Sequence, residues 1–382
     1  MNLIVAMPYT LSRAGSGAIT LHTILWAEQI GKLKKAFISS AGNVHLPLQV
    51  RKKICPYFFL QYLNVLQPNI SCKLYDLMVL RAVKKGDYVY TVSGNTPFLA
   101  RKCKKVGAHL ILDSPTSHTL TQRDLYGEEL VRLGLITCEE ITNFKKNWTY
   151  RLRYNLEQYK EAEYITCPSK FVYNSFVAHN FPEEKLRLVY YGVDTSKFTP
   201  GPKNDEMFRV LFVGVNKLRK GLRYLLMAWR KFIKYATNRV ELVVCGRNTL
   251  TDRHLMEPYY RGLWNVRRIE YVPDIVKLYQ NSSVFVLPSL EDGTGLVVSE
   301  AMACGLPCIV SETTGFKDLV AQGGGFIVPP ANSKAILEAL IYLYDNPKEV
   351  KKIGQKARSI AECYSWKHYR DALTRAYGDL YS

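Results

Sequence analysis

The sequence predicts an α/β protein with two successive domains, each built on a doubly wound parallel sheet. Short β-branched runs alternate with helical stretches along the whole chain, which is the pattern of βαβ units. This rhythm restarts after a segment rich in breaker residues, Thr199 to Asp205. The length of 382 residues also suits two domains of ordinary size better than one.

The strands of the two halves are expected from their apolar runs. In the first half these are Leu3–Met7, Ala36–Ser40, Tyr88–Val92, His109–Asp113, Tyr164–Cys167 and Arg187–Tyr190. In the second half they are Arg209–Val213, Val240–Cys245, Ile269–Val272, Val284–Leu287, Cys308–Val310 and Phe326–Val328. We therefore expect one domain over residues 1–193, a second over 194–364, and a helix over 365–382 that closes back on the first domain.

The composition is that of an ordinary folded protein, with 47% hydrophobic and 22% charged residues. No stretch approaches the ~18 uninterrupted apolar residues of a membrane-spanning helix. The first apolar residues resemble a strand rather than a signal peptide, because no basic region or cleavage site accompanies them. Nine dispersed cysteines without a Cys-x-x-Cys pair favour free thiols in a reducing compartment and offer no zinc cluster. A cytoplasmic location is expected.

Positive charge is concentrated at the N-terminus. The formal net charge is +19, and residues 1–110 contain fifteen Lys and Arg against three acids, an excess of twelve. Such a field attracts nucleic acid, an anionic membrane surface or phosphorylated substrates, unless it is a general solubility charge. No nucleic-acid-binding motif accompanies it, so no nucleic-acid partner is expected. A peripheral position on the inner face of a membrane is the alternative we keep.

One segment adds to the membrane hypothesis. Residues 50–60 couple Arg51, Lys52 and Lys53 to a run of aromatic side chains. This pairing suits the headgroup layer of an anionic membrane. The other interpretation is a core helix that starts near Tyr57 and is flanked by solvated lysines.

The segment with the most chemical information follows the strand Val284–Leu287. Gly293 and Gly295 allow backbone N–H groups to approach a ligand, and the helix that follows favours a phosphate at its start. Asp292 and Glu300 bracket this loop with seven residues between them. Carboxylates accept hydrogen bonds well from sugar hydroxyls. The alternative is a tight loop with capping acids.

These residues resemble the signature of the retaining glycosyltransferases of family 4, which have the GT-B fold. That signature is an acid, seven residues, a glutamate and Ala-Met-Ala-x-Gly-x-Pro, and it is matched by residues 292–307. The resemblance extends over most of residues 160–380 and includes Phe212-Val213-Gly214 with Arg219-Lys220-Gly221. It implies two Rossmann-like domains that face each other across a cleft. The N-terminal half is a looser match.

The resemblance also implies roles for individual residues. Glu300 is expected to hold the nucleotide ribose, Asp292 the donor sugar, and Lys220 the diphosphate. The remaining residues assigned to the nucleotide-sugar site in this half are Asn216, Arg219, Gly293, Thr294, Gly295 and Leu296. The chain departs from the family at three of its positions. The family usually has glutamate at Asp292, an aromatic residue at Thr294 and, in many members, arginine at Val215, so that Arg219 or Lys217 is the candidate second cation.

Two features of the first half join this list by resemblance. The loop Pro8–Gly17 leads into a helix expected near Ala18, and its Gly15, Ser16 and Gly17 are assigned to the donor phosphate. A plain strand–helix turn is the other interpretation, because Gly-x-Gly alone is a weak signal. His118 follows the strand His109–Asp113 and resembles a histidine near the donor sugar. A structural role is the other interpretation of a lone histidine.

The sequence therefore predicts a glycosyltransferase of hexosyltransferase type. His118, Asp292 and Lys220 are the expected catalytic residues, and retention of anomeric configuration is inherited from the resemblance. The donor is a nucleoside-diphosphate sugar, with no permanently bound cofactor and no metal. The acceptor is a glycan or lipid-linked intermediate of polysaccharide or glycolipid synthesis. The alternatives are a non-catalytic nucleotide-sugar binder and, less favoured, a basic nucleic-acid-binding protein.

Overall fold

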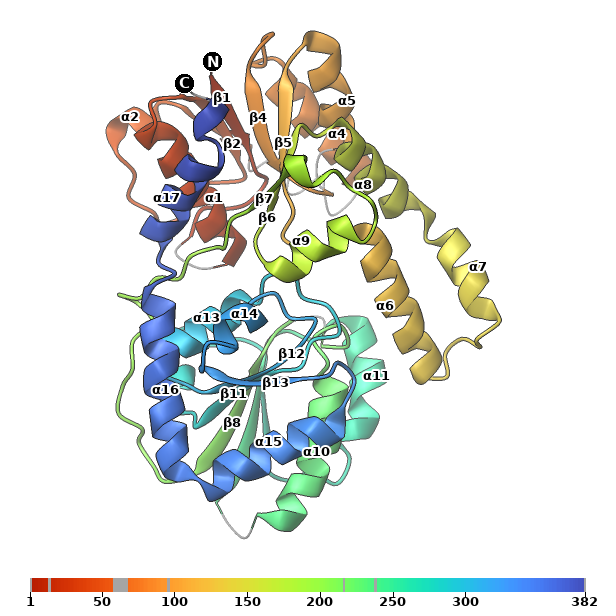
Figure 1. Cartoon of the computed structure of the whole chain (residues 1–382), viewed down its shortest axis with the longest axis vertical. Helices are drawn as coiled ribbons and strands as arrows, with labels where there is room; N and C mark the ends of the chain where they lie inside the picture. The colour runs from red at the N-terminus through yellow and green to blue at the C-terminus, as the bar shows by residue number, and fades with distance from the viewer. Residues whose placement is uncertain are drawn as a thin grey trace. The chain divides into compact units, whose positions relative to one another are not determined.

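The chain divides into two compact units in the computed structural model, which describes residues 2–12, 15–57, 68–94, 97–215, 217–236 and 239–380. Unit 1 comprises Met1–Gly192 together with Trp366–Ser382, and unit 2 comprises Val193–Ser365. Each unit contains one parallel β-sheet flanked by helices (Figure 1). The predicted fold class, two successive parallel α/β domains, is confirmed.

The sheet of unit 1 has seven strands in the order β3-β2-β1-β4-β5-β6-β7. These are β1 (Leu3–Ala6), β2 (Leu33–Ile38), β3 (Ile54–Pro56), β4 (Tyr88–Val92), β5 (His109–Asp113), β6 (Tyr164–Cys167) and β7 (Leu186–Leu188). Strands β1 and β4 are fully buried, as expected of parallel strands covered on both faces. The chain order reverses between these two strands, so that their loops open side by side at the carboxyl edge.

The helices of unit 1 come from both ends of the sequence. They are α1 (Gly15–Gln29), α2 (Leu48–Arg51), α4 (Pro68–Leu80), α5 (Pro97–Val106), α6 (Thr119–Arg132), α7 (Glu140–Asn147), α8 (Thr149–Glu161), α9 (Lys170–Val177) and α17 (Trp366–Ala376), with 3₁₀ turns at Glu183–Lys185 and Gly378–Leu380. Helix α17 packs against α1, where Trp366 stacks on His22 with ring centroids 4.6 Å apart.

Unit 2 repeats the topology with six strands in the order β10-β9-β8-β11-β12-β13. Its strands are β8 (Phe208–Val213), β9 (Val240–Cys245), β10 (Val266–Ile269), β11 (Val284–Leu287), β12 (Cys308–Ser311) and β13 (Gly325–Val328). Its helices are α10 (Leu222–Tyr235), α11 (Leu250–Tyr260), α12 (Ile275–Gln280), α13 (Leu296–Ala303), α14 (Lys317–Val320), α15 (Ser333–Asp345) and α16 (Pro347–Glu362). Helix α10 packs against α11 and α15, and α13 packs against α16.

Each predicted strand but one shares at least half of its residues with an observed strand. The strand expected at Ile269–Val272 lies instead at Val266–Ile269. It is the edge strand of unit 2, and its register is set by parallel pairing with Leu242–Cys245 of β9. An edge strand tolerates charged residues in its middle, here Arg267 and Arg268, and the apolar pattern therefore misplaces it.

The basic and aromatic segment at residues 50–60 also differs from expectation. Strand β3 occupies Ile54–Pro56, and Tyr57 is buried against Tyr75 with ring centroids 4.5 Å apart. Tyr57 is therefore a core residue rather than a membrane-facing one. Residues 58–60 of this segment lie outside the described residues.

A buried polar network fastens the C-terminal segment to the sheet of unit 1. Asp113, at the end of β5, is fully buried and accepts hydrogen bonds from Tyr191 (2.6 Å) and Tyr90 (3.4 Å). Tyr377 bonds Thr166 (2.6 Å), which also accepts from Tyr90. Burial raises the pKa of Asp113 to about 7, although the two tyrosine hydroxyls act in the opposite direction. Residues 113 and 377 thus belong to one interior cluster.

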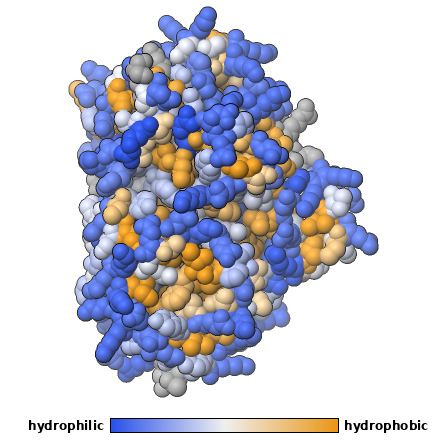
Figure 2. Space-filling view, viewed as in Figure 1, coloured by the Kyte–Doolittle hydropathy of each residue, from blue (hydrophilic) through white to orange (hydrophobic). Residues whose placement is uncertain are grey.

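The displayed face of the molecule is mostly hydrophilic, with apolar patches between the charged side chains (Figure 2). Among the described residues, no helix combines the length and apolarity that crossing a bilayer requires. The cysteines Cys55, Cys72, Cys103, Cys138, Cys167, Cys245, Cys304, Cys308 and Cys363 are free.

The raised pKa of Asp113 predicts a pH dependence of stability. The folded protein holds a proton on this carboxyl up to about pH 7, whereas the unfolded chain releases it near 3.8. The free energy of unfolding should therefore fall as pH rises from about 4 to 7, by on the order of 2–4 kcal/mol from this group. Asp113→Asn should flatten that fall. Urea unfolding of unit 1 at several pH values measures it, and an unchanged slope in the variant contradicts it.

Candidate active site

The predicted nucleotide-sugar residues of unit 2 gather where the chain order of its sheet reverses. Strands β8 and β11 are neighbours, yet 70 or more residues separate them along the chain. The loop after β8 carries Arg219 and Lys220, and the loop after β11 carries Asp292 to Gly295. Open parallel sheets bind ligands at this position, outside the carboxyl ends of the strands.

The two loops are held together through their backbones. Leu290 N–H donates to the carbonyl of Arg219 at 2.8 Å. Gly221 caps α10 with φ +70°, and a Cβ on this residue would lie 1.9 Å from the carbonyl oxygen of Pro288. Only glycine fits there, because both the backbone conformation and the close approach exclude a side chain.

Two ion pairs reinforce this contact side by side. Arg219 Nη1 lies 2.8 Å from Glu291 Oε2, and Lys220 Nζ contacts Asp292 Oδ2. Both carboxylates are nearly buried. Burial opposes the charge of Asp292, but the cations of Lys220 and Arg219 outweigh it and lower its pKa. Lys220 is thus ion-paired with Asp292 in a largely buried position and is not a solvated surface lysine.

The glycine loop leads from Asp292 into α13. Gly295 has φ +69° and forms the N-cap, and Asp292 Oδ1 accepts from Thr294 N–H at 3.4 Å. Asp292 therefore binds both the lysine and the loop amides that precede the helix. Glu300 lies in the second turn of this helix, because α13 begins at Leu296.

Glu300 is buried and meets a residue that the sequence did not single out. Tyr279 Oη, from α12, donates to Glu300 Oε2 at 3.0 Å. Burial raises the pKa of Glu300 to about 7, and the tyrosine hydroxyl partly offsets this. No local pattern pointed to Tyr279, since it lies 21 residues before its partner in a short helix.

Both candidates for the second cation, Lys217 and Arg219, already have partners within the protein. Lys217 Nζ donates to the carbonyl of Gly246 (3.0 Å) and to Asn248 Oδ1 (2.5 Å), which braces the loop after β9. Arg219 is paired with Glu291 as described. Val215 is half exposed at the position where many family members have arginine. Asn216, also assigned to the site, lies outside the described residues.

The candidate residues of the first loop lie in unit 1. Gly15, Ser16 and Gly17 form the first turn of α1, so the helix starts three residues earlier than expected at Ala18. A Cβ on Gly17 would lie 2.2 Å from the carbonyl oxygen of Thr10. Gly17 therefore permits the close packing of the preceding loop on the helix.

His118 is a buried N-cap of α6 in the same unit. Its Nδ1 accepts from Leu120 N–H at 3.3 Å, and its ring stacks on His179 with centroids 4.4 Å apart. Burial, followed by the charge of His179, lowers the pKa of His118 to about 3. The neutral ring with an accepting Nδ1 carries its proton on Nε2. These contacts give His118 a structural role, and its approach to a donor sugar stays a prediction.

Comparison with known proteins identifies related sequences. Residues 194–360 match the family model described as "Glycosyl transferases group 1". An uncharacterized glycosyltransferase of Methanocaldococcus jannaschii is 26% identical over 241 residues, 58% of this chain and 61% of the relative. The O-antigen chain mannosyltransferase B of Escherichia coli is 30% identical over 176 residues, 44% of this chain and 45% of that protein. The matched segments thus span roughly half the length of these relatives.

Solved structures resemble the whole chain. The Anabaena protein HepE, in complex with UDP and glucose, has a TM-score of 0.69 at 14% identity, over 99% of this chain and 100% of its own. The sucrose-phosphate synthase of Thermosynechococcus elongatus has a TM-score of 0.67 at 16% identity, over 100% and 99%. At these identities the likeness shows the fold, which is GT-B. The matched family model and the sequence relatives named here are those of glycosyltransferases.

The close approach of the two loops predicts a strong effect at Gly221. Gly221→Ala should destabilise unit 2 by about 1–3 kcal/mol, because it adds strain at positive φ to a clash with the backbone of Pro288. Gly262→Ala is the matched control, since its φ is +73° but its nearest neighbour is the end of the Arg230 side chain at 3.7 Å. Thermal unfolding compares them, and equal losses in both variants contradict the interpretation.

Proposed function

We propose that this chain transfers a sugar from a nucleoside-diphosphate sugar to an acceptor hydroxyl, with retention of anomeric configuration. The observation that carries the proposal is the buried pair of Lys220 and Asp292 beside the glycine loop at the reversal point of unit 2. A cation and a carboxylate in contact suit a nucleotide sugar, because the cation can bind its phosphate and the carboxylate can bind its sugar hydroxyls.

The negative charge that develops in the reaction can be stabilised by Lys220 and the glycine loop. The bond from the anomeric carbon to the diphosphate oxygen breaks, and the leaving nucleoside diphosphate gains negative charge. An ammonium has three N–H donors, so Lys220 can bind the diphosphate while it keeps Asp292. Amides of the glycine loop and the start of α13 add to this electrostatic stabilisation.

The remaining roles follow the resemblance. Asp292 accepts hydrogen bonds from hydroxyls of the donor sugar, and Glu300 accepts from the ribose. The acceptor hydroxyl attacks the anomeric carbon, and its proton passes to the departing phosphate oxygen. His118 retains a proposed place near the donor sugar, where its Nε2–H acts as a hydrogen-bond donor rather than as a base. Gly15, Ser16 and Gly17 are proposed to meet the donor phosphate.

Donor and acceptor class are supported by what the similar proteins are named for. HepE was crystallised with UDP and glucose. The relatives include an O-antigen mannosyltransferase and a Staphylococcus aureus glycosyltransferase of capsular polysaccharide biosynthesis, 32% identical over 162 residues. A glycan or lipid-linked acceptor of polysaccharide or glycolipid synthesis is proposed here on that basis.

Three substitutions should separate the proposed roles. Glu300→Gln should weaken binding of nucleoside diphosphate and of nucleotide sugar alike, by about tenfold or more, because both carry the ribose. Asp292→Asn should lower transfer far more than it lowers diphosphate affinity, because of the two ends of the donor the Asp292 carboxylate is proposed to meet only the sugar, and an amide of the same shape still accepts a hydrogen bond from Lys220. Lys220→Ala should lower turnover by about 10²–10³. Calorimetry with the diphosphate and turnover of a labelled donor measure these effects.

The control for these variants is Glu338→Gln, on an exposed part of α15. If Glu300→Gln and Asp292→Asn lose diphosphate affinity equally, the roles assigned to the two carboxylates are wrong. Donor binding without any turnover of the wild-type chain would instead identify a non-catalytic nucleotide-sugar binder. Retained DNA binding at moderate salt, with no donor binding, would favour a nucleic-acid-binding protein.

Unit 1 is further proposed to lie on an anionic membrane surface. Its first 110 residues carry the excess of twelve positive charges, and α5 exposes Arg101, Lys102, Lys104 and Lys105. Each Lys or Arg near such a surface contributes about 1 kcal/mol to the binding free energy, and this attraction is screened as salt rises.

In a flotation experiment at low salt, the protein should float with anionic vesicles but not with neutral ones. Lys102→Glu with Lys105→Glu should weaken this more than Lys334→Glu in unit 2, and equal binding to both vesicle types contradicts it.

A further inference from the structure

Unit 2 contains a cavity at the edge of its sheet opposite the candidate active site. The cavity measures about 390 Å³, and its lining includes Phe208, Ser283 and Pro307. Phe208 begins β8, while Ser283 and Pro307 directly precede β11 and β12. These residues mark the amino ends of the strands. With strands of four to six residues, about 13–20 Å separate this edge from the carboxyl edge that carries Lys220 and Asp292.

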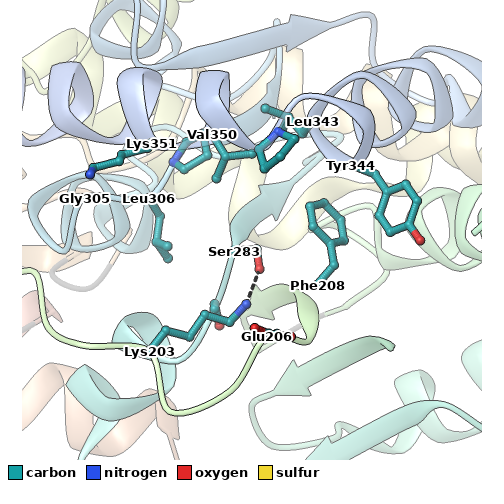
Figure 3. A pocket seen from close by; sticks show the side chains of 13 residues that line it. Lys203, Glu206, Phe208, Ser283, Gly305, Leu306, Leu343, Tyr344, Val350 and Lys351 are labelled. Carbon is teal, nitrogen blue, oxygen red and sulfur yellow. Dashed lines mark hydrogen bonds between the residues drawn. The ribbon is translucent and has the colours of Figure 1, made fainter. Parts of the chain in front are cut away.

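The walls of the cavity are largely apolar. They are formed by the side chains of Phe208, Leu306, Leu343, Tyr344 and Val350. In Figure 3 the side chains of Leu343 and Val350 project from the helices on one side, and Lys203 extends beneath them from the other side. A volume of this size lies within the range of small-molecule sites, which combine apolar walls with a few fixed polar groups.

Lys203 supplies a fixed positive charge at the floor. Its Nζ donates to Ser283 Oγ at 2.9 Å and contacts the carbonyl of Met207. These two bonds use two of the three donors of an ammonium. The side chain is half-buried, and burial lowers the pKa of Lys203 because it disfavours the charged form. An anion placed in the cavity would compensate this desolvated cation.

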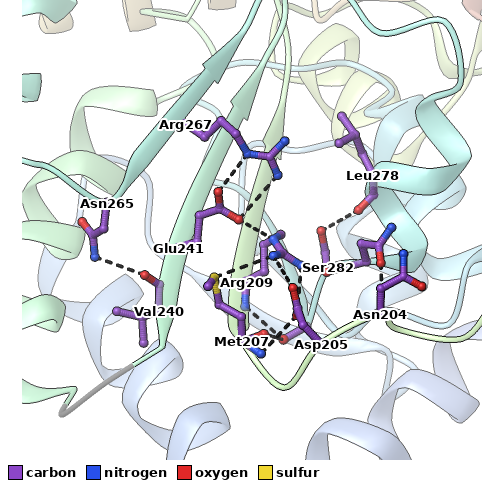
Figure 4. Close-up of polar contacts among 12 residues, drawn as sticks. Asn204, Asp205, Met207, Arg209, Val240, Glu241, Asn265, Arg267, Leu278 and Ser282 are labelled. Atoms are coloured by element: carbon purple, nitrogen blue, oxygen red, sulfur yellow. Dashed lines mark hydrogen bonds and ion pairs between the residues drawn. The ribbon is translucent and has the colours of Figure 1, made fainter.

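The acids closest to Lys203 along the chain are already paired with other cations. Asp205 Oδ2 lies 2.8 Å from Arg209 Nη2, in a network that also joins Arg209 to Glu241 (Figure 4). Glu206, which also lines the cavity, has an exposed side chain that lies 3.0 Å from Arg239. The same network ties the segment at residues 203–209 to the amino edge of the sheet, so that Lys203 is held in place.

The N-terminus of helix α16 is a second source of positive potential at the cavity, in addition to Lys203. Helix α16 has 16 residues and begins at Pro347, which lines the cavity together with Lys351 of the next turn. Its N-cap, Asn346, makes no side-chain cap hydrogen bond. The positive end of the helix dipole favours an anion at this place.

We infer that this cavity is a binding site for a small amphipathic anion, with one phosphate or carboxylate on Lys203 and an apolar body against Phe208, Leu306 and Val350. The site is separate from the proposed donor site and does not depend on the proposed function. Phosphate and carboxylate heads share this chemistry, and two probes with the same chain, octyl phosphate and octanoate, distinguish them.

Calorimetry on the full-length protein tests the inference. Octyl phosphate or octanoate should bind, whereas octan-1-ol and inorganic phosphate alone should bind at least tenfold more weakly. Lys203→Met removes the charge at similar length and should lower affinity about tenfold or more. Lys334→Met, a solvated lysine on α15, is the matched control and should bind like the wild type.

A further variant and a competitor locate the ligand. Val350→Trp should block binding by filling the cavity while Lys203 remains in place. An excess of UDP, GDP or ADP should leave binding unchanged, because the donor site is not involved. The inference is overturned if Lys203→Met binds within twofold of the wild type, if octan-1-ol binds as well as the anions, or if a nucleoside diphosphate displaces the bound anion. Loss of sugar transfer in any of these proteins bears on the proposed function alone.

Discussion

The arrangement of unit 2 depends on the buried ion pair between Lys220 and Asp292. It joins two loops that leave neighbouring strands but lie 72 residues apart in the chain. Each charge is tolerated in the interior because the other is present, and removal of one partner of such a pair typically costs about 3–5 kcal/mol. The glycine-loop amides, the start of α13 and Glu300 follow Asp292 directly in sequence, so the pair positions the whole candidate site.

The sequence was most informative where burial acts on consecutive residues. Strands such as β4 and β11 are covered on both faces, and their apolar runs predicted their bounds closely. The edge strand β10 was misplaced, because one open edge allows Arg267 and Arg268 within it. Strand β3 was missed for a similar reason, since it is a three-residue edge strand among basic residues.

The sequence predicted which residues form the candidate site but not which of them contact one another. The acids and glycines after β11 form a local pattern, and their resemblance to a family selected them. That Lys220 pairs with Asp292, Tyr279 with Glu300, and Lys217 with Asn248 depends on the distant approach of separate loops. No periodicity encodes such pairs. The amino-edge cavity escaped notice for the same reason, because its lining comes from four separate stretches of the chain, within residues 203–208, 282–283, 305–307 and 343–351.

The return of the C-terminal segment to unit 1 has a consequence for how the chain folds during synthesis. Unit 2 is one continuous stretch, and its two ends meet where Val193 N–H bonds the carbonyl of Tyr364 at 2.9 Å. All of its strands are therefore available once residue 365 has left the ribosome. Unit 1 begins earlier in the sequence than unit 2 but lacks Tyr369 and Tyr377 of its interior until all of unit 2 has been synthesised. Of the two units, the one that starts earlier in the chain is thus completed later.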